Sequence, residues 1–299
     1  MVYTLNMRGI NEMDLGLDLK SKIFTMKKMI VPIDFSEVSR NAAIYAAQMS
    51  ADIEDSEILL YHVYAKYTAG SDGSPLSPDD EARKTVTEAA LNNIRKDLLY
   101  YTASKVSILA EEGNLPNNLE ILVRNADAQL VIMGISGSSK LDQILIGSNT
   151  LKVIRKISFP VLIVPPGSKY NRITKAVFAS DFIDVEQTTP ISSLRQILDI
   201  FRPELHVIHI DETQTKKLGD NFKVEKEKMD KLLVGLNPQY SFLDTDNFLN
   251  GISNYVKEQK ANLIITVPRW HNFLNEIFKT THTEKLIYHT DVPILAIHE

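Results

Sequence analysis

The sequence predicts an α/β protein that consists of two tandem domains, each built on a doubly wound parallel sheet. Short apolar runs alternate with helical patterns between residues 28 and 164, and the same order begins again at residue 175. Strands that alternate with helices are connected by right-handed crossovers, which produce a parallel sheet. The length of 299 residues also exceeds what one hydrophobic core usually serves, so we expect each half to form its own core.

The first half contains predicted strands separated by helices. Residues 28–34 form a short apolar run, after which Ser36 caps a helical pattern rich in alanine. A Gly/Ser/Pro-rich loop is predicted at residues 69–78, between the second strand and a long helix. The further strands are predicted at residues 57–63, 105–110, 129–133 and 159–164, and the further helices at residues 79–101, 118–124 and 141–156.

The second half repeats the first after a linker that begins with Pro165, Pro166, Gly167 and Ser168. Equivalent residues lie 147 positions apart at the ends of the first two strands (Asp34 and Asp181, His62 and His209), but 133 positions apart at the last strand (Pro160 and Pro293). The second half has therefore lost fourteen residues, and we expect the loop after its second strand to account for most of them. Its strands are predicted at residues 175–180, 205–210, 263–267 and 292–297. The predicted boundaries are an extension at residues 1–26, a first domain at 27–165, a linker at 166–172 and a second domain at 173–299.

The composition excludes several classes of function. A net charge of -5, from 33 basic and 38 acidic residues, offers no general attraction to a nucleic acid backbone. No apolar run reaches the roughly 18 residues that a membrane span needs. The absence of cysteine removes disulfides, thiolate catalysis and cysteine-based metal sites. Residues 1–26 lack the pattern of a signal peptide and contain no element of either repeat, so we expect a cytoplasmic protein in which this extension is dispensable.

Residues 131–150 (VIMGISGSSKLDQILIGSNT) carry the most specific pattern of the chain. A predicted strand runs into glycines with the spacing G-x2-G-x9-G-S, at Gly134, Gly137, Gly147 and Ser148. Glycines allow the backbone to approach an oxyanion closely, and amides at a helix start offer unpaired donors. Neither G-x4-G-K-[ST] nor G-x-G-x-x-G is present. The spacing favours a phosphate-binding loop, and glycines that only form turns around a helix start are the alternative interpretation.

Together with the segments IVPID-S, HV and PVLIVP, this loop resembles the ATP-binding branch of the universal stress protein family over residues 27–165. The resemblance implies an adenine nucleotide alpha hydrolase-like fold, with ATP as the ligand and Mg²⁺ or Mn²⁺ as its companion ion. It assigns Pro32, Asp34 and Val63 to adenine and ribose, Met133, Gly134 and Gly137 to the base and the phosphate path, and Gly147, Ser148 and Asn149 to the β- and γ-phosphates. From the residues alone, Asp34 is also explained as a strand-end cap, Val63 as a core residue and Ser148 as a helix cap.

The second half departs from this pattern at the loop. The positions of the three glycines and the serine are taken by Val267, Trp270, Thr280 and Thr281, whose side chains occupy space that phosphates need. We therefore expect one nucleotide per chain, in the first half.

The histidines do not predict a metal site. His206 and His209 are three apart on a predicted strand, so their side chains project to opposite faces. His282 and His289 lack nearby carboxylates that would complete a ligand set.

The function that follows is that of a stress-response regulatory protein, which binds an adenine nucleotide and is read by a protein partner whose identity the sequence does not give. A slow ATPase or phosphotransferase is one alternative, although Lys140 is the only basic residue within the loop and no general base accompanies it. A nucleotide-free interaction protein is another. Because members of the family commonly dimerise through their last strand, the resemblance implies that residues 159–164 and 292–297 pair within the chain, with a homodimer as the alternative.

Overall fold

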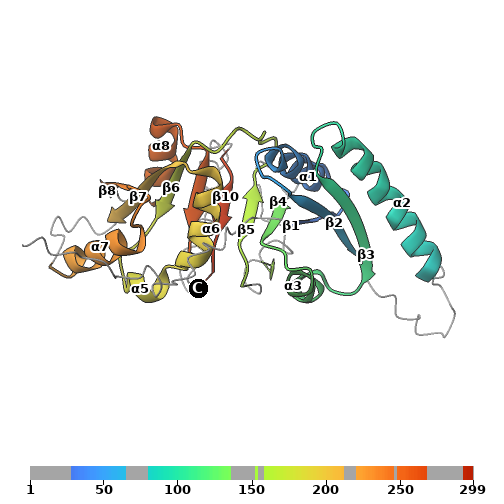
Figure 1. The fold of residues 1–299 in the computed structure, drawn as a ribbon, viewed down its shortest axis with the longest axis horizontal. Helices are drawn as coiled ribbons and strands as arrows, with labels where there is room; N and C mark the ends of the chain where they lie inside the picture. Colours follow the sequence, from blue (N-terminus) through green and yellow to red (C-terminus); the bar gives the residue numbers. More distant parts are fainter. Residues whose placement is uncertain are drawn as a thin grey trace, which may run out of the picture.

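The computed structural model describes residues 28–64, 80–135, 152–153, 158–211, 220–245, 248–267 and 292–298. Within these residues the strands form one continuous ten-stranded sheet in the order β3-β2-β1-β4-β5-β10-β9-β6-β7-β8 (Figure 1). The first half supplies the first five strands of this order and the second half supplies the other five. No helix in the described part of the chain is long and apolar enough to cross a membrane.

The first half is a parallel sheet in which the order of strand addition reverses between β1 and β4. From β1 the chain adds β2 and β3 on one side, and it then returns to add β4 and β5 on the other side. Its elements are β1 (Lys28–Pro32), α1 (Glu37–Ser50), β2 (Glu57–Tyr64), α2 (Asp80–Leu98), β3 (Lys105–Glu112), α3 (Leu115–Asn125), β4 (Leu130–Gly134) and β5 (Val161–Val164).

The second half has the same order of strands around a reversal between β6 and β9. Its elements are β6 (Lys175–Ala179), α5 (Val185–Thr188), α6 (Ile191–Phe201), β7 (Glu204–Asp211), α7 (Asp220–Leu232), β8 (Gln239–Asp244), α8 (Phe248–Gln259), β9 (Leu263–Thr266) and β10 (Ile294–Ala296). The repeat of the fold predicted from the sequence is therefore present, and β8 is a strand that the sequence reasoning missed. Its residues are only partly buried or exposed, so it carries no apolar run.

The two halves join edge to edge through β5 and β10, which pair in antiparallel fashion. The central pair of this register is Leu162 with Leu295, and these two residues are also each other's counterparts at the 133-residue offset of the repeat. The join is therefore isologous: each half presents the same edge to the other, as in a two-fold symmetric dimer. The pairing of the closing strands within one chain, which we predicted, is confirmed.

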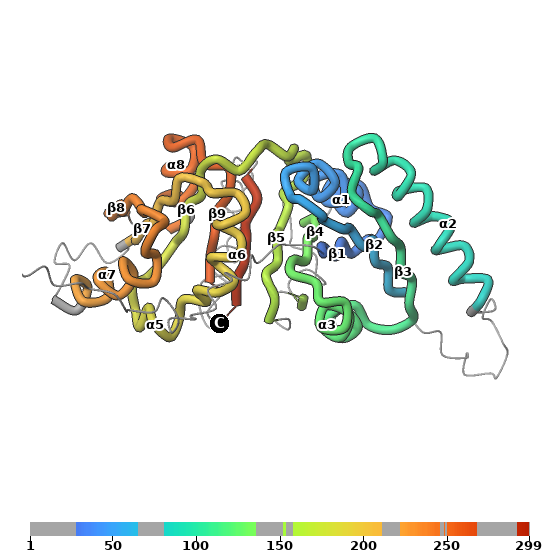
Figure 2. The backbone as a smooth tube through the Cα atoms, in the orientation of Figure 1, coloured from blue at the N-terminus to red at the C-terminus, as the bar shows by residue number. Residues whose placement is uncertain are grey.

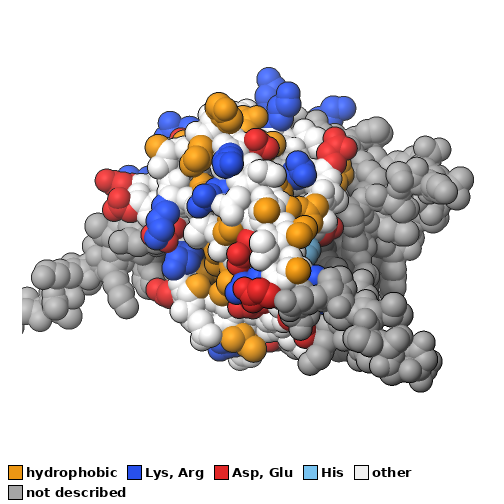
Figure 3. Space-filling view, turned by 90° about the vertical axis from the view of Figure 1, so that its right-hand side faces the viewer, with side chains coloured by type: hydrophobic (Ala, Val, Ile, Leu, Met, Phe, Trp, Pro, Cys, Tyr) orange, Lys and Arg blue, Asp and Glu red, His pale blue; other side chains and the backbone are white. Residues whose placement is uncertain are grey.

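Helices cover both faces of the sheet. Apolar residues of α1, α2, α6 and α7 belong to one buried cluster on one face, and those of α3 and α8 to a second cluster on the other. The outer surface over the first half mixes basic, acidic and apolar side chains (Figure 3). The segment of residues 165–174, here named the linker segment, runs from the end of β5 to the start of β6 (Figure 2).

Nearly all of the fourteen missing residues of the second half lie between its second strand and the end of the helix that follows. Residues 65–79 separate β2 from α2, whereas the shorter stretch 212–219 separates β7 from α7. In addition, α2 has 19 residues and α7 has 13. Together these differences amount to thirteen residues, so the stretch that follows the second strand contains nearly the whole loss.

Candidate functional site

The carboxyl ends of β1 and β4 form the most promising ligand site of the first half. These strands are neighbours, with Ile30 beside Val131. The next strand after β1 is added on one side of this pair, and the next strand after β4 is added on the other side. In open α/β sheets ligands bind in the crevice at such a reversal, beyond the carboxyl ends of the strands. The predicted site residues Pro32 and Asp34 lie at the end of β1, and Met133 and Gly134 lie at the end of β4.

Gly134 holds a position that no larger residue can take without a shift of the backbone. A Cβ atom added there would lie 2.4 Å from the carbonyl oxygen of Val38, in the first turn of α1. The glycine thus allows the end of β4 to approach the start of α1 closely. The remaining predicted loop residues, Gly137, Gly147, Ser148 and Asn149, lie outside the described residues.

Asp34 is exposed and forms a tight turn with the start of α1. Its Oδ1 accepts hydrogen bonds from the backbone N–H of Ser36, at 3.0 Å, and from the Ser36 hydroxyl. Partial burial raises the pKa of Asp34, but hydrogen bonds from Ser36 and Ser39 outweigh this effect and leave its pKa below the ordinary value. Ser36 in turn caps α1 by accepting the N–H of Ser39, as its position in the sequence predicts. The strand end therefore presents an ionised carboxylate beside a capped helix start.

The second half contains the same turn. Asp181 Oδ1 accepts the N–H of Ile183 at 3.1 Å, and the residues that follow the two aspartates, Phe35 and Phe182, have φ angles of +65° and +54°. His62 Nδ1 lies 2.6 Å from the carbonyl oxygen of residue 33, and His209 Nδ1 lies 3.1 Å from that of residue 180. Because this turn persists in the half that lacks the loop glycines, it belongs to the frame of the fold. The turn alone does not identify a ligand site.

The apolar residues predicted to contact adenine share one face of the sheet. Strand alternation places Pro32, Val63 and Met133 on the face that α3 covers, whereas Gly134 meets α1 on the opposite face. Pro32 and Met133 are buried, and Val63 is half-buried against the apolar cluster. Half-burial suits a core side chain and a wall of a ligand site equally, so both interpretations of Val63 stand.

In the second half, side chains of α7 pack around the turn that follows β6 and around the start of α5. The ring of Phe222 packs on Phe182 at a centroid distance of 4.8 Å. Three residues further along the helix, the Glu225 carboxylate accepts the N–H of Val185 at the start of α5, at 2.8 Å. Hydrogen bonds from Lys228 and from the Val185 backbone lower the pKa of Glu225. The carboxylate of Glu225 thus supplies an acceptor at the start of α5, whereas in the first half the Ser36 hydroxyl accepts the N–H of Ser39 at the start of α1.

Sequence reasoning did not find Glu225, although the sequence does indicate that the start of α5 needs an acceptor from elsewhere. Position 183 carries isoleucine where the first half has the capping Ser36, so the helix start in the second half has lost its hydroxyl acceptor. Buried helix starts need a replacement for such an acceptor. Which distant residue provides it depends on how α7 docks.

The two strand histidines serve separate structural roles on opposite faces, as predicted. His206 is buried, with Nδ1 2.7 Å from the Tyr255 hydroxyl and Nε2 2.9 Å from the Glu204 carboxylate. His209 packs against Phe182 and Phe222 on the other face. His282 and His289 lie outside the described residues.

The first half is similar in sequence to known universal stress proteins. The model of the universal stress protein family matches residues 25–165. Two universal stress proteins of Methanocaldococcus jannaschii are 29% identical to the chain over 147 and 154 residues, which is 48% and 46% of this chain and 84% and 94% of those proteins. The crystal structure of a universal stress protein from Archaeoglobus fulgidus matches with a TM-score of 0.64 at 17% identity, over 92% of this chain and 97% of the other. The match over nearly the whole length confirms the predicted α/β fold with two similar halves.

Proposed function

We propose that the chain, whose residues 25–165 match the model of the universal stress protein family, binds ATP in its first half and acts as a regulatory protein of the stress response. The observation that carries this proposal is the position of the G-x2-G-x9-G-S pattern. It starts at the carboxyl end of β4, where the order of strand addition in the sheet reverses. A loop of this spacing at this point combines backbone donors with the crevice in which doubly wound sheets bind ligands.

The residues around the reversal fit an adenine nucleotide. The ionised carboxylate of Asp34 is exposed and can accept hydrogen bonds from ribose hydroxyls in addition to those from Ser36. Val63, which is half-buried, would offer apolar surface to the base, beside the buried Pro32 and Met133. The amides of the glycine loop and the Ser148 hydroxyl would hold the phosphates, and a divalent cation such as Mg²⁺ or Mn²⁺ would neutralise their charge.

The stoichiometry of the proposal is one ATP per chain. In the second half, Val267 replaces the glycine at the strand end, and Phe222 and Glu225 fill the region around the start of α5. A nucleotide in the first half is connected to the second half through the β5–β10 join. ATP would therefore act as a stabilising ligand of one half, and a protein partner that contacts both halves would sense it.

The two equivalent aspartates provide a matched test. Asp34→Asn and Asp181→Asn both keep an oxygen that can accept the N–H of the turn, so both should leave the fold intact. In calorimetric titration with ATP and Mg²⁺, Asp34→Asn should weaken binding about tenfold or more, because a hydrogen bond to a charged acceptor contributes about 1.5–3 kcal/mol. Asp181→Asn should bind like the parent protein. Absence of ATP binding by the parent protein, or equal losses in both variants, would refute the proposed site.

A further inference from the structure

The linker segment is packed tightly along α1. The side chain of Asn41 donates hydrogen bonds to the carbonyl oxygen of Ser168, at 3.1 Å, and to that of residue 165. The Tyr170 ring meets the Tyr45 ring edge-on at 5.3 Å, and its hydroxyl donates to the Asp52 carboxylate. The linker segment therefore fills a groove beside the first helix of the first half before the chain enters β6.

The chain enters β1 and β6 through the same contacts. At β6, the Lys175 N–H donates to the side-chain oxygen of Asn262, whose own N–H donates to the Lys175 carbonyl oxygen at 2.8 Å. At β1, the Lys28 N–H donates to the side-chain oxygen of Gln129 at 2.9 Å, and the Gln129 N–H donates back to Lys28 at 3.0 Å. The first residue of β1 thus lies at a point of the sheet that is equivalent to the end of the linker segment.

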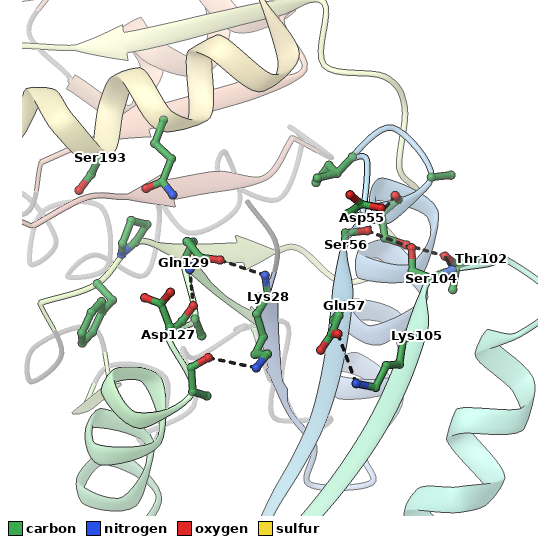
Figure 4. A pocket seen from close by; sticks show the side chains of 18 of the residues that line it. Lys28, Asp55, Ser56, Glu57, Thr102, Ser104, Lys105, Asp127, Gln129 and Ser193 are labelled. Atoms are coloured by element: carbon green, nitrogen blue, oxygen red, sulfur yellow. Dashed lines mark hydrogen bonds and ion pairs between the residues drawn. The ribbon is translucent and has the colours of Figure 1, made fainter. Parts of the chain in front are cut away.

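A large cavity lies at this point and extends to α6 of the second half. Its volume is about 1410 Å³, and its lining includes Lys28 together with Ser193 and Gln196 of α6 (Figure 4). The helix α6 is the counterpart of α1, and the counterparts of Ser193 and Gln196 on α1 are Ala46 and Met49, which are both buried. The groove on α1 is filled, whereas Ser193 and Gln196 on α6 face an open cavity within the described residues.

The sequence before β1 resembles the sequence of the linker segment at the same 147-residue offset. Residues 20–28 read KSKIFTMKK, and residues 167–175 read GSKYNRITK. Serine and lysine recur in the same order, and Met26 stands where the linker segment has Ile173, which is buried in the apolar core. The internal repeat therefore begins about ten residues upstream of β1, inside the extension that sequence reasoning treated as dispensable.

We propose that residues 18–27 occupy the cavity against α6 of their own chain, as residues 165–174 occupy the groove against α1. Ile23 takes the place of Tyr170, and Ser192 of α6 takes the place of Tyr45. Met26 enters the core as Ile173 does. The N-terminal segment thereby ties the first half to the second, just as the linker segment ties the second half to the first. This inference does not depend on ATP binding.

The absence of native cysteine allows a direct test by disulfide trapping in the full-length chain. Ile23→Cys combined with Ser192→Cys should form an intramolecular disulfide under mild oxidation at least tenfold faster than the control pair Ile23→Cys with Val86→Cys. Val86 is 70% exposed on α2 and lies away from α6. Peptide mapping by mass spectrometry identifies the bond. Equal rates for the two pairs would overturn the proposal, and so would a disulfide formed only between two chains, which would make a second copy the occupant.

Hydrogen exchange provides a second measurement, which is made on the parent protein and needs no cysteine substitution. The amides of residues 21–27 should exchange at least tenfold more slowly than those of residues 2–12, because backbone in a packed groove is shielded from water. Gln196→Trp, which would fill the cavity from the side of α6, should remove this protection and leave that of β1 unchanged. Equally fast exchange of both stretches in the parent protein would overturn the proposal.

Discussion

The join between the halves makes a quantitative prediction for Leu162. Its side chain is 2% exposed and faces Leu295, which is 1% exposed, at the centre of the β5–β10 register. Replacing Leu162 with Asp removes the burial of a leucine side chain, which contributes about 2 kcal/mol. It also leaves an unpaired polar group in the core, so the total cost to the free energy of unfolding should be about 4 kcal/mol or more. Because the join is isologous, Leu295→Asp should cost the same.

Urea denaturation followed by tryptophan fluorescence and circular dichroism measures this loss, and small-angle scattering reports whether the halves separate. Leu99→Asp is the matched control, because Leu99 is 58% exposed at the end of α2 and its substitution should change the unfolding free energy by less than about 0.5 kcal/mol. The reasoning fails if the Leu162 and Leu295 variants keep the parent stability and the parent scattering curve. It also fails in part if their costs differ widely, because that would mean the join is not symmetric in energy.

Two further variants test the asymmetry of the halves. Gly137→Val should abolish ATP binding in calorimetry without a change in the circular dichroism spectrum, because a branched side chain would enter the phosphate path; unchanged affinity would contradict the site assignment. Glu225→Gln should remove a contribution to stability that the parent protein has above pH 4.5, the ordinary pKa of the group, and loses as the pH falls through the lowered pKa of the folded state. Melting temperatures of the parent protein and the variant between pH 3 and pH 7 measure this contribution. If the two plots of melting temperature against pH are parallel, Glu225 does not contribute to the pH dependence of stability.

The sequence predicted the frame of the fold because the frame depends on local patterns. Apolar runs and helical periods located nine of the strands, and the offset between equivalent residues identified the repeat. The strand β8 escaped because an exposed edge strand needs no apolar run. The long first helix of the repeat is divided into α5 and α6 at Pro190, which ends a regular helix because it lacks an N–H donor.

The site could be predicted only where it depends on backbone geometry. Gly134 was singled out by its spacing, and the structure adds that the close approach of the Val38 carbonyl oxygen leaves no room for a larger side chain there. The pairing of Glu225 with Val185 joins residues 40 positions apart, and it follows from the docking of α7. Such contacts have no local pattern in the sequence. The same holds for the filling of the groove on α1 by Tyr170.

The differences between the halves form a consistent set when the helix starts are considered. A helix start carries N–H donors that must find acceptors. In the first half, Ser36 satisfies one donor locally, and the glycine at the end of β4 allows the backbone to approach the helix start closely. In the second half, Ile183 offers no hydroxyl, and the Glu225 carboxylate takes over as an acceptor within the chain. A nucleotide phosphate placed at the start of α5 would have to displace this carboxylate and lie beside its charge. Loss of the glycine loop and gain of the internal carboxylate therefore disfavour a second nucleotide for independent reasons, so restoring glycine at Val267 alone should not create a second ATP site in calorimetric titration.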